Sequence, residues 1–297
     1  MPHTRRKIPP SQQHKRLQVT DSSGWTHVTT TGNARRLNRR HNRDQDRRNE
    51  GKTTSEQNGQ EPEHETLEPL LPAEAPASVT LPELQKKLSE FRLKFEASET
   101  WRCAERAMRH AFPFPSTLLA GREGKNEADP DANELSIVCI GLGSPSGFLR
   151  GGWVDRRNVS MYQLAALTSI MGWIETNHPK PKLRLNTYAQ DPVFNTHDKS
   201  LLESSSISVL EHPGAFEKVS SHTILFCPGA ERRHLELLLS RDPAVIFGGP
   251  LEDIDSMVVK RYLEDRDTVK LGVFEEQEHA FWGMGVYFPS TDGNGEG

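Results

Sequence analysis

From residue 135 onward, short apolar runs alternate with stretches whose apolar residues recur at helical spacing. The short runs predict strands at 135–140, 183–189, 207–210, 222–227, 244–247, 269–274 and 281–288. The stretches between them predict helices at 158–178, 196–204, 230–240 and 254–265. Strands that alternate with helices imply crossover connections and a mainly parallel sheet covered on both faces. We therefore expect an α/β fold with a Rossmann-like sheet core at about 135–290.

A long amphipathic stretch precedes this region. Thr80 and Glu83 have the spacing of a capping box, and Pro82 falls in the first helical turn. Apolar residues then recur at helical spacing as far as residue 113, which predicts one long helix at about 80–113, or two with a break near Ser98. We interpret the apolar stripe as packing surface for the sheet domain, with binding of a partner helix as the alternative.

The first eighty residues contain few large apolar side chains. Residues 1–52 hold 13 Lys and Arg against 4 Asp and Glu, and residues 53–80 hold six Glu and no Lys or Arg. Such segments do not bury enough apolar surface to offset the entropy of ordering, so we predict a disordered basic arm and an acidic Pro/Glu linker at 1–79, with the folded domain at 80–297. The basic cluster at Arg35–Arg48 is typical of a nuclear-import signal or a weak nucleic-acid contact. A passive tail and a mitochondrial presequence remain as alternatives.

Composition excludes several classes of protein. No apolar run approaches the roughly 18–20 residues of a membrane helix, and no apolar run follows the basic N-terminus as in a secretory signal. The three cysteines form no C-x-x-C pair, which argues against a disulfide framework or a cysteine zinc site. We expect a protein of the cytoplasm or nucleus with no membrane contact.

The segment directly after the first sheet strand is the most informative one for chemistry. Gly141, Gly143 and Ser144 begin a G-x-G-x-x-S-G pattern where a Rossmann fold brings backbone amides close to a ligand. The pattern is not the full dinucleotide fingerprint, so a purely structural tight turn is the alternative. Asp191 follows the second strand, where an acidic residue often accepts hydrogen bonds from a ribose, or where it begins a turn.

Two more glycine loops are expected at the same edge. Pro228 and Gly229 follow the fourth strand, and Gly248 follows the fifth. Open α/β sheets bind ligands at the carboxyl ends of their strands, so we predict a binding site there. Its candidate residues are Gly141, Gly143, Ser144, Tyr162, Gln163, Asp191, Pro228, Gly229 and Gly248. The spacing predicts no catalytic set and no metal site, and the cofactor stays unknown.

Several blocks together resemble the sensitivity-to-red-light-reduced (SRR-like) family. They are Ile140–Ser144, Tyr162–Ala165, Asp191–Phe194, Leu225–Pro228 and Ile246–Gly248. The resemblance implies an α/β regulatory domain associated with light signalling, circadian control and haem-biosynthesis regulation, with no established catalytic residues. Where the family commonly has Pro-His-Cys and Gly-Asn-Ser, this chain has 228–230 as Pro-Gly-Ala and 248–250 as Gly-Gly-Pro.

From these observations we expect a non-catalytic regulatory protein that binds a small ligand or a protein partner at the carboxyl edge. The alternative is a transferase or oxidoreductase that uses an adenosine-containing cofactor such as S-adenosylmethionine or NAD.

Overall fold

A computed structural model describes residues 16–20, 26–30, 71–112, 134–149, 155–178 and 184–290. The chain divides into two compact units, Met1–Pro69 and Leu70–Gly297, so the division lies ten residues before the boundary expected from composition. In the first unit, β1 (Arg16–Thr20) and β2 (Thr26–Thr30) pair antiparallel, although no strand was predicted in the arm. Their threonines and valines favour extended backbone. The basic cluster at Arg35–Arg48 lies outside the described residues.

The second unit is built on a seven-stranded sheet with the order β5-β4-β3-β6-β7-β9-β8. The first five strands are parallel, and β9 is antiparallel to both of its neighbours. The expectation of a mainly parallel α/β sheet is therefore confirmed. The strands are β3 (Glu134–Ile140), β4 (Arg184–Gln190), β5 (Ser208–Val209), β6 (Thr223–Cys227), β7 (Val245–Gly248), β8 (Arg266–Lys270) and β9 (Gly285–Pro289).

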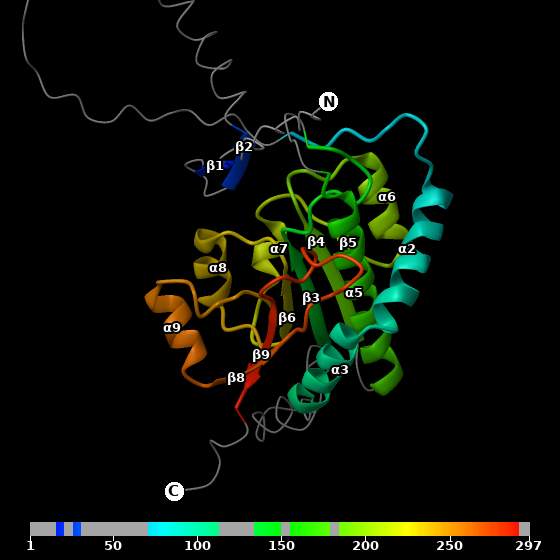
Figure 1. Cartoon of the computed structure of the whole chain (residues 1–297). Helices are drawn as coiled ribbons and strands as arrows, with labels where there is room; N and C mark the ends of the chain where they lie inside the picture. Colours follow the sequence, from blue (N-terminus) through cyan, green and yellow to red (C-terminus); the bar gives the residue numbers. More distant parts are fainter. Residues whose placement is uncertain are drawn as a thin grey trace, which may run out of the picture. The chain divides into compact units, whose positions relative to one another are not determined.

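Helices cover both faces of this sheet (Figure 1). One face carries α2 (Leu81–Glu96), α3 (Glu99–Ala111), α5 (Arg157–Asn177) and α6 (Thr196–Ser204). The other face carries α7 (Gly214–Glu217), α8 (Arg232–Leu239) and α9 (Met257–Leu263). Along β3, Ile137 and Cys139 face the first core, while Val138 and Ile140 face the second. This double burial explains why the central strands are continuous apolar runs.

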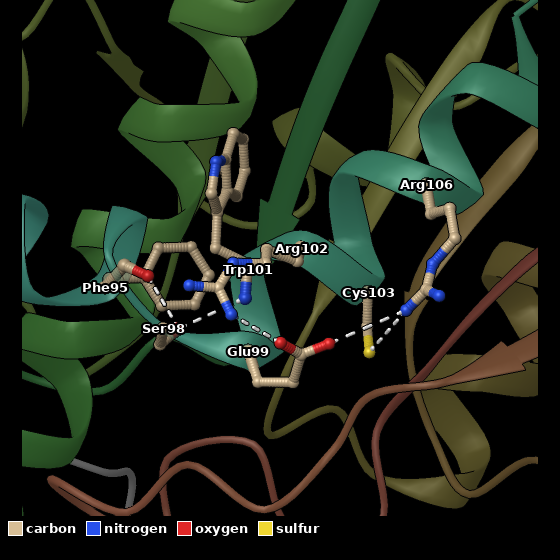
Figure 2. A network of polar contacts seen from close by, with 7 residues as sticks. All are labelled: Phe95, Ser98, Glu99, Trp101, Arg102, Cys103 and Arg106. Atoms are coloured by element: carbon tan, nitrogen blue, oxygen red, sulfur yellow. Dashed lines mark hydrogen bonds and ion pairs between the residues drawn. The ribbon is translucent and has the colours of Figure 1, made fainter.

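The N-terminal helices form as the sequence predicts, in the two-helix version. The Thr80 backbone amide donates a hydrogen bond to Oε2 of Glu83 at 3.0 Å, as in the capping box predicted for the start of α2. The break falls at Ser98, whose Oγ accepts a hydrogen bond from the Trp101 amide and caps α3 (Figure 2). Phe95, at the end of α2, is fully buried against Trp101. The predicted apolar stripe therefore packs on the domain itself.

The last two predicted strands are misplaced. β8 is Arg266–Lys270 rather than 269–274, and β9 begins at Gly285 rather than at 281. Residues 271–284 instead form a long connection between β8 and β9. The connection is held in place by its own Phe274 and Phe281, whose side chains are buried in the core. The apolar residues of this connection have the spacing of a strand, but they form no strand pairing. The Phe281 ring packs on Phe95 of α2, and the Phe274 ring packs on Tyr162 of α5. The short helix α7 was not predicted.

Candidate functional site

The carboxyl ends of the parallel strands lie at one edge of the sheet. The chain moves outward from β3 through β4 to β5, then returns to the other side of β3 at β6. This reversal is the topological switch point, where ligands of open α/β sheets bind. The loops after β3, β4, β6 and β7 start at this edge, so the structure brings together the predicted residues that follow these strands.

At the switch point, the loops after β3 and β6 touch backbone to backbone. Gly141 has φ +77°, and a Cβ atom there would lie 2.6 Å from the carbonyl carbon of Gly229. A Cβ atom on Gly229 would lie 2.5 Å from the carbonyl oxygen of Gly141. Both positions therefore require glycine for internal packing alone. This contact favours the tight-turn interpretation of these two glycines.

Asp191 holds the glycine loop in place. Its Oδ2 accepts a hydrogen bond from the Gly143 amide at 2.8 Å, and its Oδ1 accepts one from the Val193 amide at 3.0 Å. Burial raises the pKa of this carboxyl above its ordinary value, while the two amide donors partly oppose that rise. Gly143 has φ +72° and packs on Ser160 at the start of α5. Asp191 thus binds the protein's own backbone, and its bond to the Val193 amide favours the turn alternative over the ribose acceptor.

Ser144 belongs to a second buried network. Its Oγ donates to Oδ2 of Asp198 at 2.6 Å and accepts from the Gly147 amide at 2.8 Å. Ser146 donates its amide to Oδ1 of Asp198 at 2.9 Å, and Asn195 completes a capping box with Asp198 at the start of α6. Burial raises the pKa of Asp198, opposed by these hydrogen bonds. Sequence reasoning missed Asp198, although the spacing of Asn195 and Asp198 is a capping signal.

Tyr162 and Gln163 do not face the glycine loops. The Tyr162 ring stacks on Phe91 with centroids 4.0 Å apart and meets Phe274 edge-on at 4.8 Å. Gln163 donates from Nε2 to the carbonyl oxygen of Ala280 at 2.9 Å. Both side chains anchor the connection 271–284 to α5. Tyr162 and Gln163, near the start of α5, therefore pack against that connection and do not line the switch point.

The loop after β7 is organised by a tyrosine of β9. The Tyr287 hydroxyl accepts a hydrogen bond from the Leu251 amide at 3.0 Å and donates to Oε2 of Glu252 at 2.7 Å. Gly248 packs on the Cys227 side chain, with 2.5 Å between a Cβ atom at position 248 and Sγ. Pro228 is half-buried next to the exposed Gly229. The loops after β6 and β7 therefore present mainly backbone amide and carbonyl groups to a ligand, with few polar side chains.

The connection 271–284 also belongs to this edge, because β8 ends there and β9 begins there. A cavity of about 320 Å³ opens on it. Sequence reasoning missed this feature because it assigned both ends of the connection to strands. The signal was present as an acidic run at 275–278 next to Trp282. Among the residues that the structure describes, no group of histidine, cysteine or acidic side chains is placed to hold a metal.

Two solved structures of the plantazolicin methyltransferase BpumL, each with SAH and a desmethylPZN analog, are 13% and 11% identical to the chain. They cover 61% and 70% of this chain, and 68% and 96% of theirs, each with a TM-score of 0.23, which carries no conclusion about activity. No curated protein matches the chain, and no helix in the described part is long and apolar enough to cross a membrane. The model of the SRR1 domain matches residues 109–288, so the resemblance is confirmed and the chain belongs to the SRR1 domain family.

Proposed function

We propose that this SRR1-domain protein is a non-catalytic regulatory module that binds a small ligand or a protein partner at the carboxyl edge of its sheet. The observation that carries the proposal is the topological switch point between β3 and β6, an edge of the sheet where the loops after four parallel strands begin. The family resemblance suggests roles in light or circadian signalling or in the control of haem biosynthesis. Such roles fit a protein of the cytoplasm or nucleus.

The polar side chains at this edge are engaged in hydrogen bonds within the chain, which supports a binding role over a catalytic one. Asp191 and Asp198 are buried and accept several hydrogen bonds each from the chain itself. Ser144 donates to Asp198 and accepts from the Gly147 amide, and Asp198 also accepts from the Ser146 and Asn195 amides, so both groups are engaged within the chain. These groups hold the loops in shape. A bound molecule would then meet backbone groups and the exposed side chains at the rim of the edge.

An enzyme is the second candidate. Numbered along the chain, the five parallel strands have the order 3-2-1-4-5, which is the order of a Rossmann dinucleotide-binding sheet. That order favours an adenosine-containing cofactor, S-adenosylmethionine or NAD, above the same switch point. Native mass spectrometry of the purified protein separates the two candidates, because an adenosine-containing cofactor retained by the protein would support the enzyme.

A pair of arginine substitutions at opposite ends of β6 tests the binding site. Ala230→Arg places a long cation beside the Gly141–Gly229 contact, whereas Ser221→Arg places the same side chain on an exposed turn at the amino end of the strand. Thermal unfolding is measured with nucleotides, S-adenosylmethionine, NAD and haem. A ligand at about 100 times its Kd stabilises the folded state by about 2.7 kcal/mol, which is readily detected as a higher Tm.

We expect at least one of these ligands to raise the Tm of the wild type and of Ser221→Arg, and to leave the Tm of Ala230→Arg unchanged. A ligand that stabilises all three proteins equally would bind elsewhere and contradict the site. The small-ligand form of the proposal fails if no compound stabilises the wild type.

A further inference from the structure

The connection 271–284 holds two large apolar side chains in water. Val273 is 77% exposed and Trp282 is 80% exposed. Neither is on a loosely held loop, because Phe274 and Phe281 are buried directly beneath them and Gln163 binds the Ala280 carbonyl. An exposed indole on a loop whose neighbouring residues are packed is typical of a binding residue, since tryptophan is enriched among the residues that dominate binding energy at protein interfaces.

The exposed indole borders a cavity that combines apolar and acidic groups. The cavity has a volume of about 320 Å³, and its wall includes Val273, Glu278, His279 and Trp282. The His279 ring lies 6.1 Å from the Trp282 ring, centroid to centroid. The carboxylate of Glu278 is 72% exposed and lies 3.7 Å from Nε2 of His279, with which it forms an ion pair when that ring is protonated. An aromatic face and a solvent-exposed carboxylate therefore line the same opening.

The charge of the connection has one sign. Glu275, Glu276 and Glu278 are all exposed, and residues 271–284 contain no Lys or Arg. Glu276 pairs with Lys94 of α2 at 3.4 Å, and Glu278 lies 3.7 Å from His279, so the connection keeps a net negative charge even when that histidine is protonated. A surface of this kind attracts a cationic partner and disfavours an acidic one.

We propose that the cavity between Trp282 and Glu278 takes an arginine side chain presented by a segment of a partner protein. A guanidinium is planar and weakly hydrated, so it stacks on an indole while its fork of N–H groups binds a carboxylate. A lysine ammonium is a compact, strongly hydrated charge and satisfies only the carboxylate well. The aliphatic stem of the arginine would cover Val273.

This inference rests on the proposed binding function at the same edge, and it names the partner's chemistry. The full chain is titrated with fluorescein-labelled glycine-rich peptides that carry three arginines, and with matched peptides in which lysine or citrulline replaces each arginine. Citrulline keeps the planar shape and removes the charge. Binding is followed by fluorescence anisotropy at two salt concentrations.

We expect the arginine peptide to bind, the lysine peptide to bind at least about fivefold more weakly, and the citrulline peptide to show no binding. Trp282→Ala should weaken binding of the arginine peptide about tenfold, about 1.4 kcal/mol, and Glu278→Gln severalfold. The matched control is Met257→Ala, which removes an apolar side chain that is 79% exposed on α9. Circular dichroism verifies that each variant is folded.

Equal affinity for the arginine and lysine peptides, with no effect of Trp282→Ala, would mean non-specific charge attraction and overturn the inference. Absence of binding to the full chain overturns it as well. If the peptides fail while a ligand stabilises the wild type but not Ala230→Arg, the proposed function stands and this inference alone is wrong.

Discussion

Two buried carboxylates determine how the loop after β3 is held. Asp191 binds the Gly143 amide from the end of β4, and Asp198 binds Ser144 and Ser146 from the first turn of α6. A carboxylate is acceptor-only when ionised, so each oxygen satisfies donors that would otherwise be buried without partners. The loop's shape is therefore set by acids that come from later parts of the chain.

Asp198→Ala tests this residue-scale account. The change leaves the Ser144 hydroxyl and the Ser146 and Asn195 amides without their acceptor, so we expect the free energy of unfolding to fall by about 3 kcal/mol. Asp253→Ala, on the exposed surface, should change it by less than about 0.5 kcal/mol. Urea unfolding measures both, and a loss equal to that of the control would contradict the role of Asp198.

The same variant has a pH dependence of definite sign. Burial raises the pKa of Asp198, so the folded protein holds this proton more tightly than the unfolded chain does. The carboxyl thus contributes most stability below its unfolded pKa of about 4 and loses that contribution as the pH rises through the raised value. The deficit of Asp198→Ala relative to wild type should therefore be largest at about pH 4 and should shrink as the pH rises toward neutrality.

Residue by residue, the candidate site was only partly predictable. The positions of Gly141 and Gly143 follow from the strand-then-glycine pattern, since few other residues adopt a positive φ. The neighbours of these glycines could not be predicted, because Gly229 and Ser160 contact them only through tertiary packing. For the same reason the bond of Asp191 to the Gly143 amide was not foreseen, whereas its bond to the Val193 amide fits the turn that the sequence offered as an alternative.

At the scale of elements, α2 and α3 are part of the domain core. Phe95 is 1% exposed, and its ring lies within 5.9 Å, centroid to centroid, of Trp101, Phe274 and Phe281. One side chain thereby joins the end of α2, the start of α3 and the connection 271–284. The exposed ion pairs of Glu99 with Arg102 and Arg106 in Figure 2 contribute little by comparison.

Phe95→Ala should therefore destabilise three elements together. Removal of a fully buried phenylalanine lowers the free energy of unfolding by about 3–5 kcal/mol. Leu93→Ala, on the same helix with 69% of its side chain exposed, is the matched control and should change little. Urea unfolding gives the two values, and similar small losses in both variants would show that α2 is only loosely attached.

Element prediction succeeded where one signal dominated. The helix at Thr196–Ser204 was predicted to the residue because Asn195 caps it and apolar residues follow at the right spacing. β8 failed because it is an edge strand with the polar sequence RDTVK, paired on one side only. The aromatic residues that follow it looked more strand-like, yet tertiary packing uses them to hold the connection 271–284.

At the scale of the whole molecule, charge is segregated along the sequence. The net charge of −4 combines a balance of +9 in residues 1–52 with acidic balances in the rest of the chain. The arginine cluster at 35–48 is the densest part of the basic segment. We propose that this cluster gives the chain a weak, sequence-independent affinity for nucleic acid that the SRR1 domain does not share.

Two variants test that proposal, each with four arginines replaced by glutamine, one in the cluster and one on the surface of the SRR1 domain. Replacement of Arg35, Arg36, Arg39 and Arg40 should weaken binding to duplex DNA and flatten its salt dependence by about 0.9 in log–log slope for each phosphate that the chain no longer neutralises. Replacement of the exposed Arg102, Arg106, Arg109 and Arg241 removes the same charge from the domain and should leave the slope unchanged. Anisotropy titrations at several salt concentrations give both slopes. Equal changes in the two variants would show that only net charge matters, because a local interaction responds to where the arginines lie and a diffuse field does not.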